Sequence, residues 1–212
     1  MTKSAVLAKR RASCATLEEF QEHALQEFDL LFAEMAFLCE REVVMHHHEA
    51  SKYDRLGSRL DLTARFIAGG AMLCLAVGAY KVKWGVMNLN TPFGFAALNG
   101  LVLAGLLDYL ARGSGMFWST MRQKADNHKK ALAQWQCLVE ETHSYRIQLS
   151  DPRYEAMQYS KWFRKLIKAK EKATLLASVP VSTTSMFESP EAVINYKKDN
   201  RLTRGNQELP RS

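Results

Sequence analysis

The chain has 212 residues and a formal net charge of +7, with 47% hydrophobic and 24% charged residues. This length fits one domain or slightly more, and the apolar content excludes a disordered chain. The four cysteines form no CxxC pair and lie far apart, which excludes a thiolate zinc site and a dense disulfide framework. The sequence has no phosphate-binding glycine loop, GxSxG or HExxH motif, so we expect neither an enzyme nor a cofactor.

The chain begins with a basic segment, residues 1–15, that contains no Asp or Glu. We interpret it as a basic N-terminal tail, with a mitochondrial presequence as the alternative. Thr16 followed by Glu19 matches a capping box, which predicts a helix start. From there apolar residues recur at spacings of three and four, which predicts a long amphipathic helix to about residue 61. Its apolar stripe consists of Leu17, Phe20, Ala24, Phe28, Leu31, Met35 and Leu38.

Two apolar blocks follow, at 66–82 and 93–111, joined by a short link. Each is close to the 20 residues or so that cross a bilayer, so we predict a transmembrane hairpin; two buried core helices are the alternative. Lys and Arg are more frequent outside the blocks than in the link, which predicts a multi-pass membrane protein with both termini cytoplasmic. We expect the lipid bilayer as a partner and a bacterial inner membrane as the location, with an organellar inner membrane as the alternative.

Small residues recur at every fourth position in both blocks. Such ridges let helices approach closely in lipid, and here they would either close the hairpin or join subunits of a homo-oligomer. Asn99 lies in mid-block, where it would hydrogen-bond across the hairpin or line a pore, and Asp108 lies near the cytoplasmic end. One hairpin cannot enclose a channel, so a pore requires an oligomer. The candidate pore or helix-contact residues are Gly70, Cys74, Gly78, Ala96, Asn99, Gly100, Ala104 and Asp108.

A second long helix is predicted after the glycines at 113–115. One face of this helix, the seam, repeats at spacings of three and four residues without interruption, which predicts that the helix packs antiparallel on the first helix. The seam consists of Met121, Ala125, His128, Leu132, Trp135, Val139, Thr142, Tyr145 and Leu149. Pro152 predicts a bend, followed by a short basic helix to about residue 177.

The tail that follows, 178–212, is rich in Ser, Thr, Asn and Pro, which predicts a flexible segment. The predicted fold is therefore an all-α membrane protein. It consists of a transmembrane hairpin extended by two long antiparallel cytoplasmic helices, with one helical domain over 16–177, a short basic helix and a flexible tail.

Two histidine positions raise the hypothesis of a metal or pH-sensing site. His46 lies four residues after Glu42, and His128 would face the same level of an antiparallel helix pair. Packed or solvated histidines are the interpretation we prefer, so no metal is expected. Nucleic acid is not an expected partner either, because no nucleic-acid-binding motif accompanies the basic residues.

Three segments together resemble the SLATT family of two-transmembrane effector domains from bacterial immunity systems. They are HHHEASKYDRLGSRLDLTARFIAGGAMLCLAVGAY, MRQKADNHKKALAQWQCLVEETHSYR and ASVPVSTTSMFESPEAVINY, and the likeness covers most of 20–196. The resemblance implies a membrane effector that a cytoplasmic nucleotide-signal sensor or enzyme triggers. It would form a pore or disrupt the membrane and stop growth in antiviral defence. The alternative is a non-catalytic structural or scaffold subunit of a larger membrane complex, in a bacterial or an organellar membrane.

Overall fold

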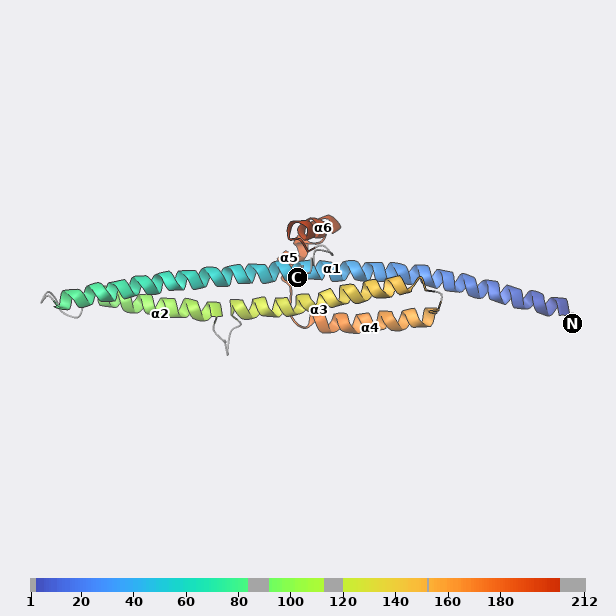
Figure 1. The fold of residues 1–212 in the computed structure, drawn as a ribbon, viewed down its shortest axis with the longest axis horizontal. Helices are drawn as coiled ribbons and strands as arrows, with labels where there is room; N and C mark the ends of the chain where they lie inside the picture. Colours follow the sequence, from blue (N-terminus) through green and yellow to red (C-terminus); the bar gives the residue numbers. More distant parts are fainter. Residues whose placement is uncertain (1–2, 84–91, 113–119, 152, 203–212) are drawn as a thin grey trace, which may run out of the picture. The chain divides into compact units, whose positions relative to one another are not determined.

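The structure is a computed structural model. It describes the backbone of residues 3–83, 92–112, 120–151 and 153–202, with side chains from residue 21 to 76 (and residue 19), 95–111, 120–151 and 153–202. Within these ranges the chain is all-α, as predicted, and has no strand (Figure 1). The helices are α1 (Lys3–Lys83), α2 (Pro92–Arg112), α3 (Met121–Gln148), α4 (Ala156–Thr174), α5 (Val181–Met186) and α6 (Pro190–Asp199).

Helix α1 begins at Lys3, so the prediction of a helix start at Thr16 is wrong. Residues 3–16 contain no Gly or Pro and are rich in Ala, Lys and Arg, which are strong helix formers. The two apolar blocks are helical, and they form the end of α1 and most of α2. The link at 84–91 lies outside the described residues.

In the part of the chain that the structure describes, no helix is both long enough and apolar enough to cross a membrane. The predicted span 66–82 extends past residue 76, where the described side chains end, and the span 93–111 starts two residues before they resume.

The chain divides into two compact units. Unit 1 consists of residues 1–46 and 130–212, and unit 2 consists of residues 47–129. Helices α1 and α3 contribute residues to both units, whereas α2 belongs to unit 2 and α4 to α6 belong to unit 1.

Unit 1 has a core of large side chains from α1, α3 and α4. Phe32, Trp135 and Leu166 are at most 1% exposed in this core. The rings of Tyr145 and Trp162 stack with centroids 5.0 Å apart. The predicted α3 seam is confirmed here, with Trp135, Thr142 and Leu149 buried.

The predicted α1 stripe is confirmed at Ala24 and Met35 and is wrong at Leu31. Leu31 is exposed, and the neighbouring Phe32 is fully buried instead. Met35 is buried as expected, and Cys39 joins it in the core. Both Leu31 and Phe32 fit a spacing of three or four, so periodicity alone could not choose between them.

The prediction of a flexible C-terminal segment is wrong for residues 181–199, which form α5 and α6. Phe187 and Val193 pack against Val44 and Met45 of α1, and this contact stabilises two helices that would be too short alone. The Ser189 hydroxyl caps α6 by accepting a hydrogen bond from the Ala192 amide at 3.2 Å. Residues 203–212 lie outside the described residues.

Candidate functional site in unit 2

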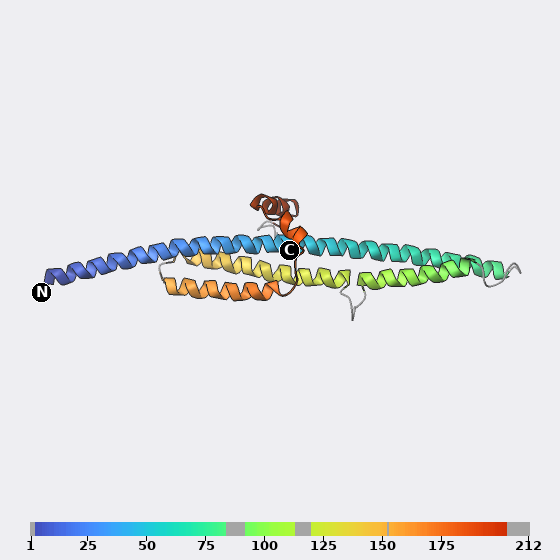
Figure 2. The ribbon, with the colours of Figure 1, turned by 180° about the vertical axis from the view of Figure 1, so that it is seen from behind.

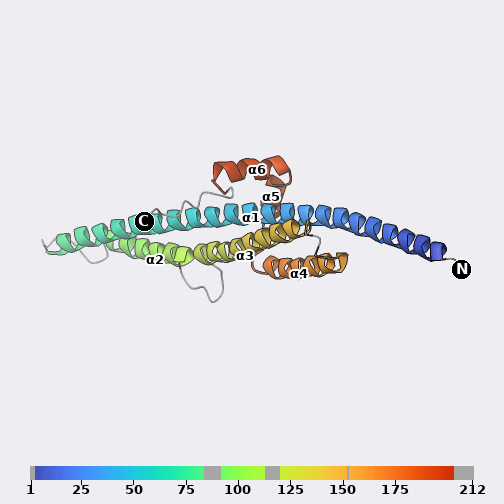
Figure 3. The same cartoon turned by 45° about the vertical axis from the view of Figure 1, so that its right-hand side comes forward.

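The helix pair of α1 and α2 is packed through small residues. Figures 2 and 3 show α2 running alongside the last part of α1. A Cβ atom added to Gly100 would lie 3.0 Å from the Ala71 Cβ atom, so the two helices touch here almost backbone to backbone. Nearby, Ala97 and Ala104 of α2 and Ala64 of α1 are buried.

Small residues recur every seven positions on both helices, and on α1 the repeat extends beyond the contact with α2 to Gly57, which faces Met121 of α3. Every buried hydrophobic residue of unit 2 in the described part of the chain is an alanine. On α1 the repeat is Ala50, Gly57, Ala64 and Ala71, and on α2 it is Ala97, Ala104 and Ala111. A strict heptad of small residues is typical of closely packed helix pairs.

The large apolar side chains of the same helices face outward. Leu73 is 69% exposed and Phe95 is 72% exposed. The exposed large hydrophobic residues between 60 and 110 are Leu62, Phe66, Met72, Leu73, Leu75, Phe95, Leu98, Leu101, Val102, Leu103, Leu106 and Tyr109. We call this set the outward apolar face. Soluble proteins rarely expose so much contiguous apolar surface.

Only part of the predicted small-residue ridges lies in the contact between α1 and α2. Gly100 and Ala104 lie in the helix contact, whereas Ala96 is exposed. Gly70 is exposed, and a Cβ atom added to it would meet nothing within 4 Å. Cys74 is partly exposed, and the surroundings of Gly78 lie outside the described residues.

Asn99 and Asp108 are both exposed on α2. The Asn99 amide donates a hydrogen bond to the Phe95 carbonyl of its own helix, at 2.9 Å. The interpretation that Asn99 bonds across the hairpin is therefore wrong, because its partner lies one turn back on the same helix. Its outward position leaves the pore-lining interpretation as a prediction.

The two candidate histidines are buried, one in each unit. His46 is 1% exposed in unit 1, and its Nε2 atom lies 3.9 Å from a Glu42 carboxylate oxygen, the pair that the spacing predicted. His128 is 5% exposed in unit 2. Among the described residues, no three His, Cys, Asp or Glu side chains are grouped to hold a metal ion.

His128 belongs to a buried polar layer between α1 and α3. Its ring stacks on Tyr53, with centroids 5.6 Å apart and planes 16° from parallel. Glu49 is fully buried, and its Oε1 atom lies 3.5 Å from Lys52 Nζ. Burial lowers the pKa of His128, because it disfavours the charged imidazolium, although the negative charge of Glu49 opposes this shift.

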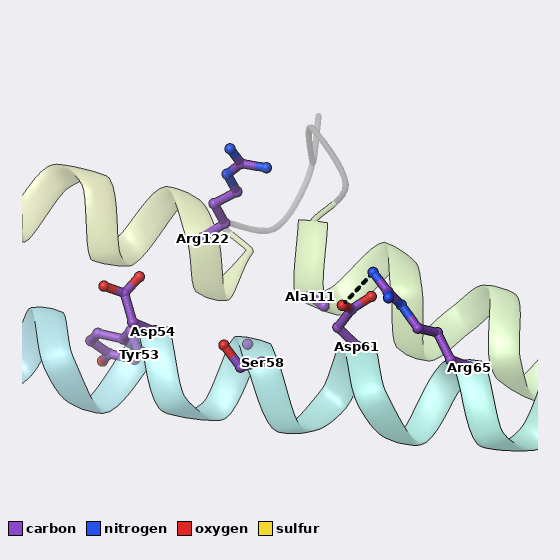
Figure 4. Close-up of a pocket in the computed structure, with 8 residues that line it drawn as sticks. Tyr53, Asp54, Ser58, Asp61, Arg65, Ala111 and Arg122 are labelled. Atoms are coloured by element: carbon purple, nitrogen blue, oxygen red, sulfur yellow. Dashed lines mark ion pairs between the residues drawn. The ribbon is translucent and has the colours of Figure 1, made fainter.

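A polar pocket lies beside this layer, where the end of α2 and the start of α3 face α1 (Figure 4). Its volume is about 250 Å³. Figure 4 shows Asp54, Ser58 and Asp61 projecting from α1, whereas the side chain of Arg122 on α3 points away from them. The lining residues are Tyr53, Asp54, Gly57, Ser58, Asp61, Arg65, Ala111 and Arg122.

Comparison with known proteins finds no match: no family model, no curated protein and no solved structure is similar to this chain. The resemblance to the SLATT family therefore stays a prediction.

The heptad of small residues and the pocket were not predicted from the sequence. The heptad signal was present, because Ala50, Gly57, Ala64 and Ala71 are seven residues apart, but small residues in an apolar block do not stand out by hydropathy. The pocket combines residues from three helices, and no local motif marks it.

Proposed function

We propose that unit 2 carries a membrane-embedded helix pair, and that copies of the chain assemble there into a pore. The observation behind this proposal is the inverted arrangement of unit 2, with alanine and glycine at the helix contact and large apolar side chains outside. Water disfavours that arrangement, whereas lipid favours it, because close packing of small residues holds helices together in a bilayer.

Exposed glycines and an exposed asparagine on the helix pair support the assembly of copies. Gly69, Gly70 and Gly105 have no heavy atom within 4 Å of an added Cβ atom, so another helix could approach closely there. Asn99 is exposed beside large apolar residues, and a polar group in lipid is costly unless it faces protein or water. A contact between copies, or a water-filled lumen, would satisfy that side chain.

The role that we propose for the pore is growth arrest after a signal from a cytoplasmic sensor. This part follows from the resemblance to the SLATT family and is proposed with it. A structural or scaffold subunit is the competing function, and it shares the membrane-embedded helix pair but not the pore.

Membrane insertion is tested by flotation of the purified full chain with liposomes. Leu73→Lys places a charge on the outward apolar face, which costs about 2.5–3.5 kcal/mol at mid-membrane, so we expect this variant to lose flotation. Leu30→Lys is the matched control, because Leu30 is 62% exposed in unit 1. Equal flotation of both variants would contradict the insertion.

Pore formation is tested by dye leakage from the same liposomes and by membrane potential in bacteria after induction. We expect the wild-type chain to cause leakage, Asn99→Leu to reduce it, and the control Val102→Leu on the same exposed surface to leave it unchanged. Gly105→Leu changes an open surface, so it should weaken assembly without opening the helix pair, whereas Gly100→Leu should disrupt the pair itself. A wild-type chain that floats without leakage would contradict the pore and favour the scaffold.

A further inference from the structure

Helix α4 carries a row of positive charge on the side that faces away from the unit 1 core. Its buried side chains include Trp162 and Leu166, and Glu171 is the only carboxylate in its sequence. The exposed cations recur at spacings of three and four residues, so they share one side of the helix. Those that form no ion pair among the described residues are Lys161, Arg164, Lys168 and Lys172. We call these four the basic row.

The first part of α1 in unit 1 carries the opposite charge. Between residues 16 and 40 the sequence has seven Asp or Glu and no Lys or Arg. The exposed carboxylates of this stretch with described side chains, which we call the acidic row, are Glu19, Glu22, Glu27 and Glu34. Glu27 lies 3.6 Å from His23 of the same helix, and the other three form no ion pair in the part of the chain that the structure describes. Leu30 is 62% exposed on the same side.

The two rows do not meet within one chain, because α1 and α4 contact each other through their inner faces. The ring of Phe28 packs on Tyr159 with centroids 5.8 Å apart, and that of Phe32 packs on Phe163 at 5.7 Å. The rows lie on the outer faces, and no ion pair joins them within the described ranges. A second copy of the chain can supply the missing contact, since each copy carries one row of each sign.

The spacing of the charges allows several ion pairs to form together. Lys161 and Lys168 are seven residues apart, as are Glu27 and Glu34, so both distances along the helix are about 10 Å. One exposed ion pair contributes little to stability, but a row of pairs adds up and selects the partner by charge. Met157, one turn before Lys161, is 67% exposed, so an apolar contact can accompany the charges.

We propose that the basic row of α4 binds the acidic row of α1 in a second copy of the chain. This contact lies in unit 1 and goes beyond the assembly proposed for unit 2. Two copies that bind reciprocally, or a closed ring of copies, would pair every row, whereas an open chain would leave one row of each sign unpaired at its ends.

The test measures association of full chains in a non-ionic detergent, by energy transfer between copies that carry a donor or an acceptor dye on a C-terminal tag. All chains carry Gly105→Leu, which should weaken the contact proposed in unit 2. One variant reverses the basic row with Lys161→Glu and Lys168→Glu, and the other reverses the acidic row with Glu27→Lys and Glu34→Lys. We expect each variant alone to associate about tenfold more weakly, because attraction becomes repulsion. An equal mixture of the two should associate as the parent chain does, because opposite charges then face each other again.

The matched control is Lys130→Glu with Lys198→Glu. Both lysines are exposed in unit 1 outside α4, so this pair changes the net charge equally and should leave association unchanged. An equal loss in the control and in the reversed basic row would overturn the proposal. So would a mixture that stays weak, or an association that does not change between about 0.05 and 0.5 M salt.

Lipid is the competing partner of the basic row. If its reversal leaves association unchanged but lowers flotation with phosphatidylglycerol liposomes, the row binds anionic headgroups and the proposal is overturned. Flotation with phosphatidylcholine liposomes separates these results from the proposed function. Neither reversal changes the outward apolar face, so both variants should float there as the parent chain does.

Discussion

Unit 1 and unit 2 are both built from α1 and a returning helix, yet they bury opposite kinds of side chain. Unit 1 encloses Phe32, Trp135 and Leu166, whereas the buried hydrophobic residues described in unit 2 are all alanines. In unit 1 the burial of large side chains from water supplies the stability. In unit 2 the backbones of the two helices approach closely instead, and the large apolar side chains are exposed. The same chain thus combines a core of large side chains with a helix pair that has its large side chains outside.

The largest expected effect is at the centre of the unit 1 core. Trp135→Ala should lower the free energy of unfolding by about 3–5 kcal/mol, because it leaves a large cavity. Chemical unfolding followed by circular dichroism measures this loss. Ile147→Ala, at a position that is 76% exposed, should change stability by less than about 0.5 kcal/mol. Similar losses for both variants would mean that Trp135 is not a core residue.

In unit 2 a small-to-large substitution at the helix contact should lower stability. Ala97 is fully buried, so Ala97→Leu should overpack the contact and lower the free energy of unfolding by about 1–3 kcal/mol. Leu98→Ala, at a neighbouring position that is 61% exposed, should have little effect on the stability of the helix pair in detergent. Thermal unfolding in the same detergent compares the two variants. If Leu98→Ala is the more destabilising, the inverted arrangement of unit 2 is refuted.

The buried polar layer should make unit 2 sensitive to acid. Because the pKa of His128 is lowered in the folded chain, the unfolded chain takes up a proton first as the pH falls. The contribution of His128 is therefore complete above its usual pKa of 6.5 and is lost as the pH falls through the lower folded value. His128→Phe keeps the stacking on Tyr53 but cannot titrate. We expect its melting temperature to fall less than that of the wild type between pH 7.5 and 5.5, and parallel curves would contradict this assignment.

The smallest effect is expected at the surface of unit 1. Arg146 donates hydrogen bonds to both carboxylate oxygens of Asp29, at 2.7 and 3.2 Å, but both side chains are exposed. Arg146→Ala should cost less than about 1 kcal/mol, and high salt should weaken the wild-type contribution. A loss as large as that of Trp135→Ala would show that charge pairs, rather than the aromatic core, hold unit 1 together.

Periodicity predicted the α3 side of the unit 1 core, but not the place of Phe32 on α1. The α3 seam was read correctly because Trp135 and Leu149 combine hydropathy with regular spacing. The helical segment 181–199 was not predicted, because α5 and α6 are polar in sequence and depend on contacts with Val44 and Met45. The start of α1 was also predicted at the wrong residue. The helix contact of unit 2 was only half predicted. Gly100 and Ala104 were identified, but alanine gives almost no hydropathy signal that separates the contact face from the exposed face.

The repeat of Ala50, Gly57, Ala64 and Ala71 also limits how the length of the chain can change in evolution. One residue deleted between Ala64 and Ala71 would rotate everything beyond it by about 100° around the helix axis, and Met72 would take the place of Ala71 opposite Gly100. A change of seven residues would keep the register, because seven residues complete about two turns. Sequences that share this helix pair should therefore differ in length here by whole heptads, and single-residue insertions should be confined to the segments between helices.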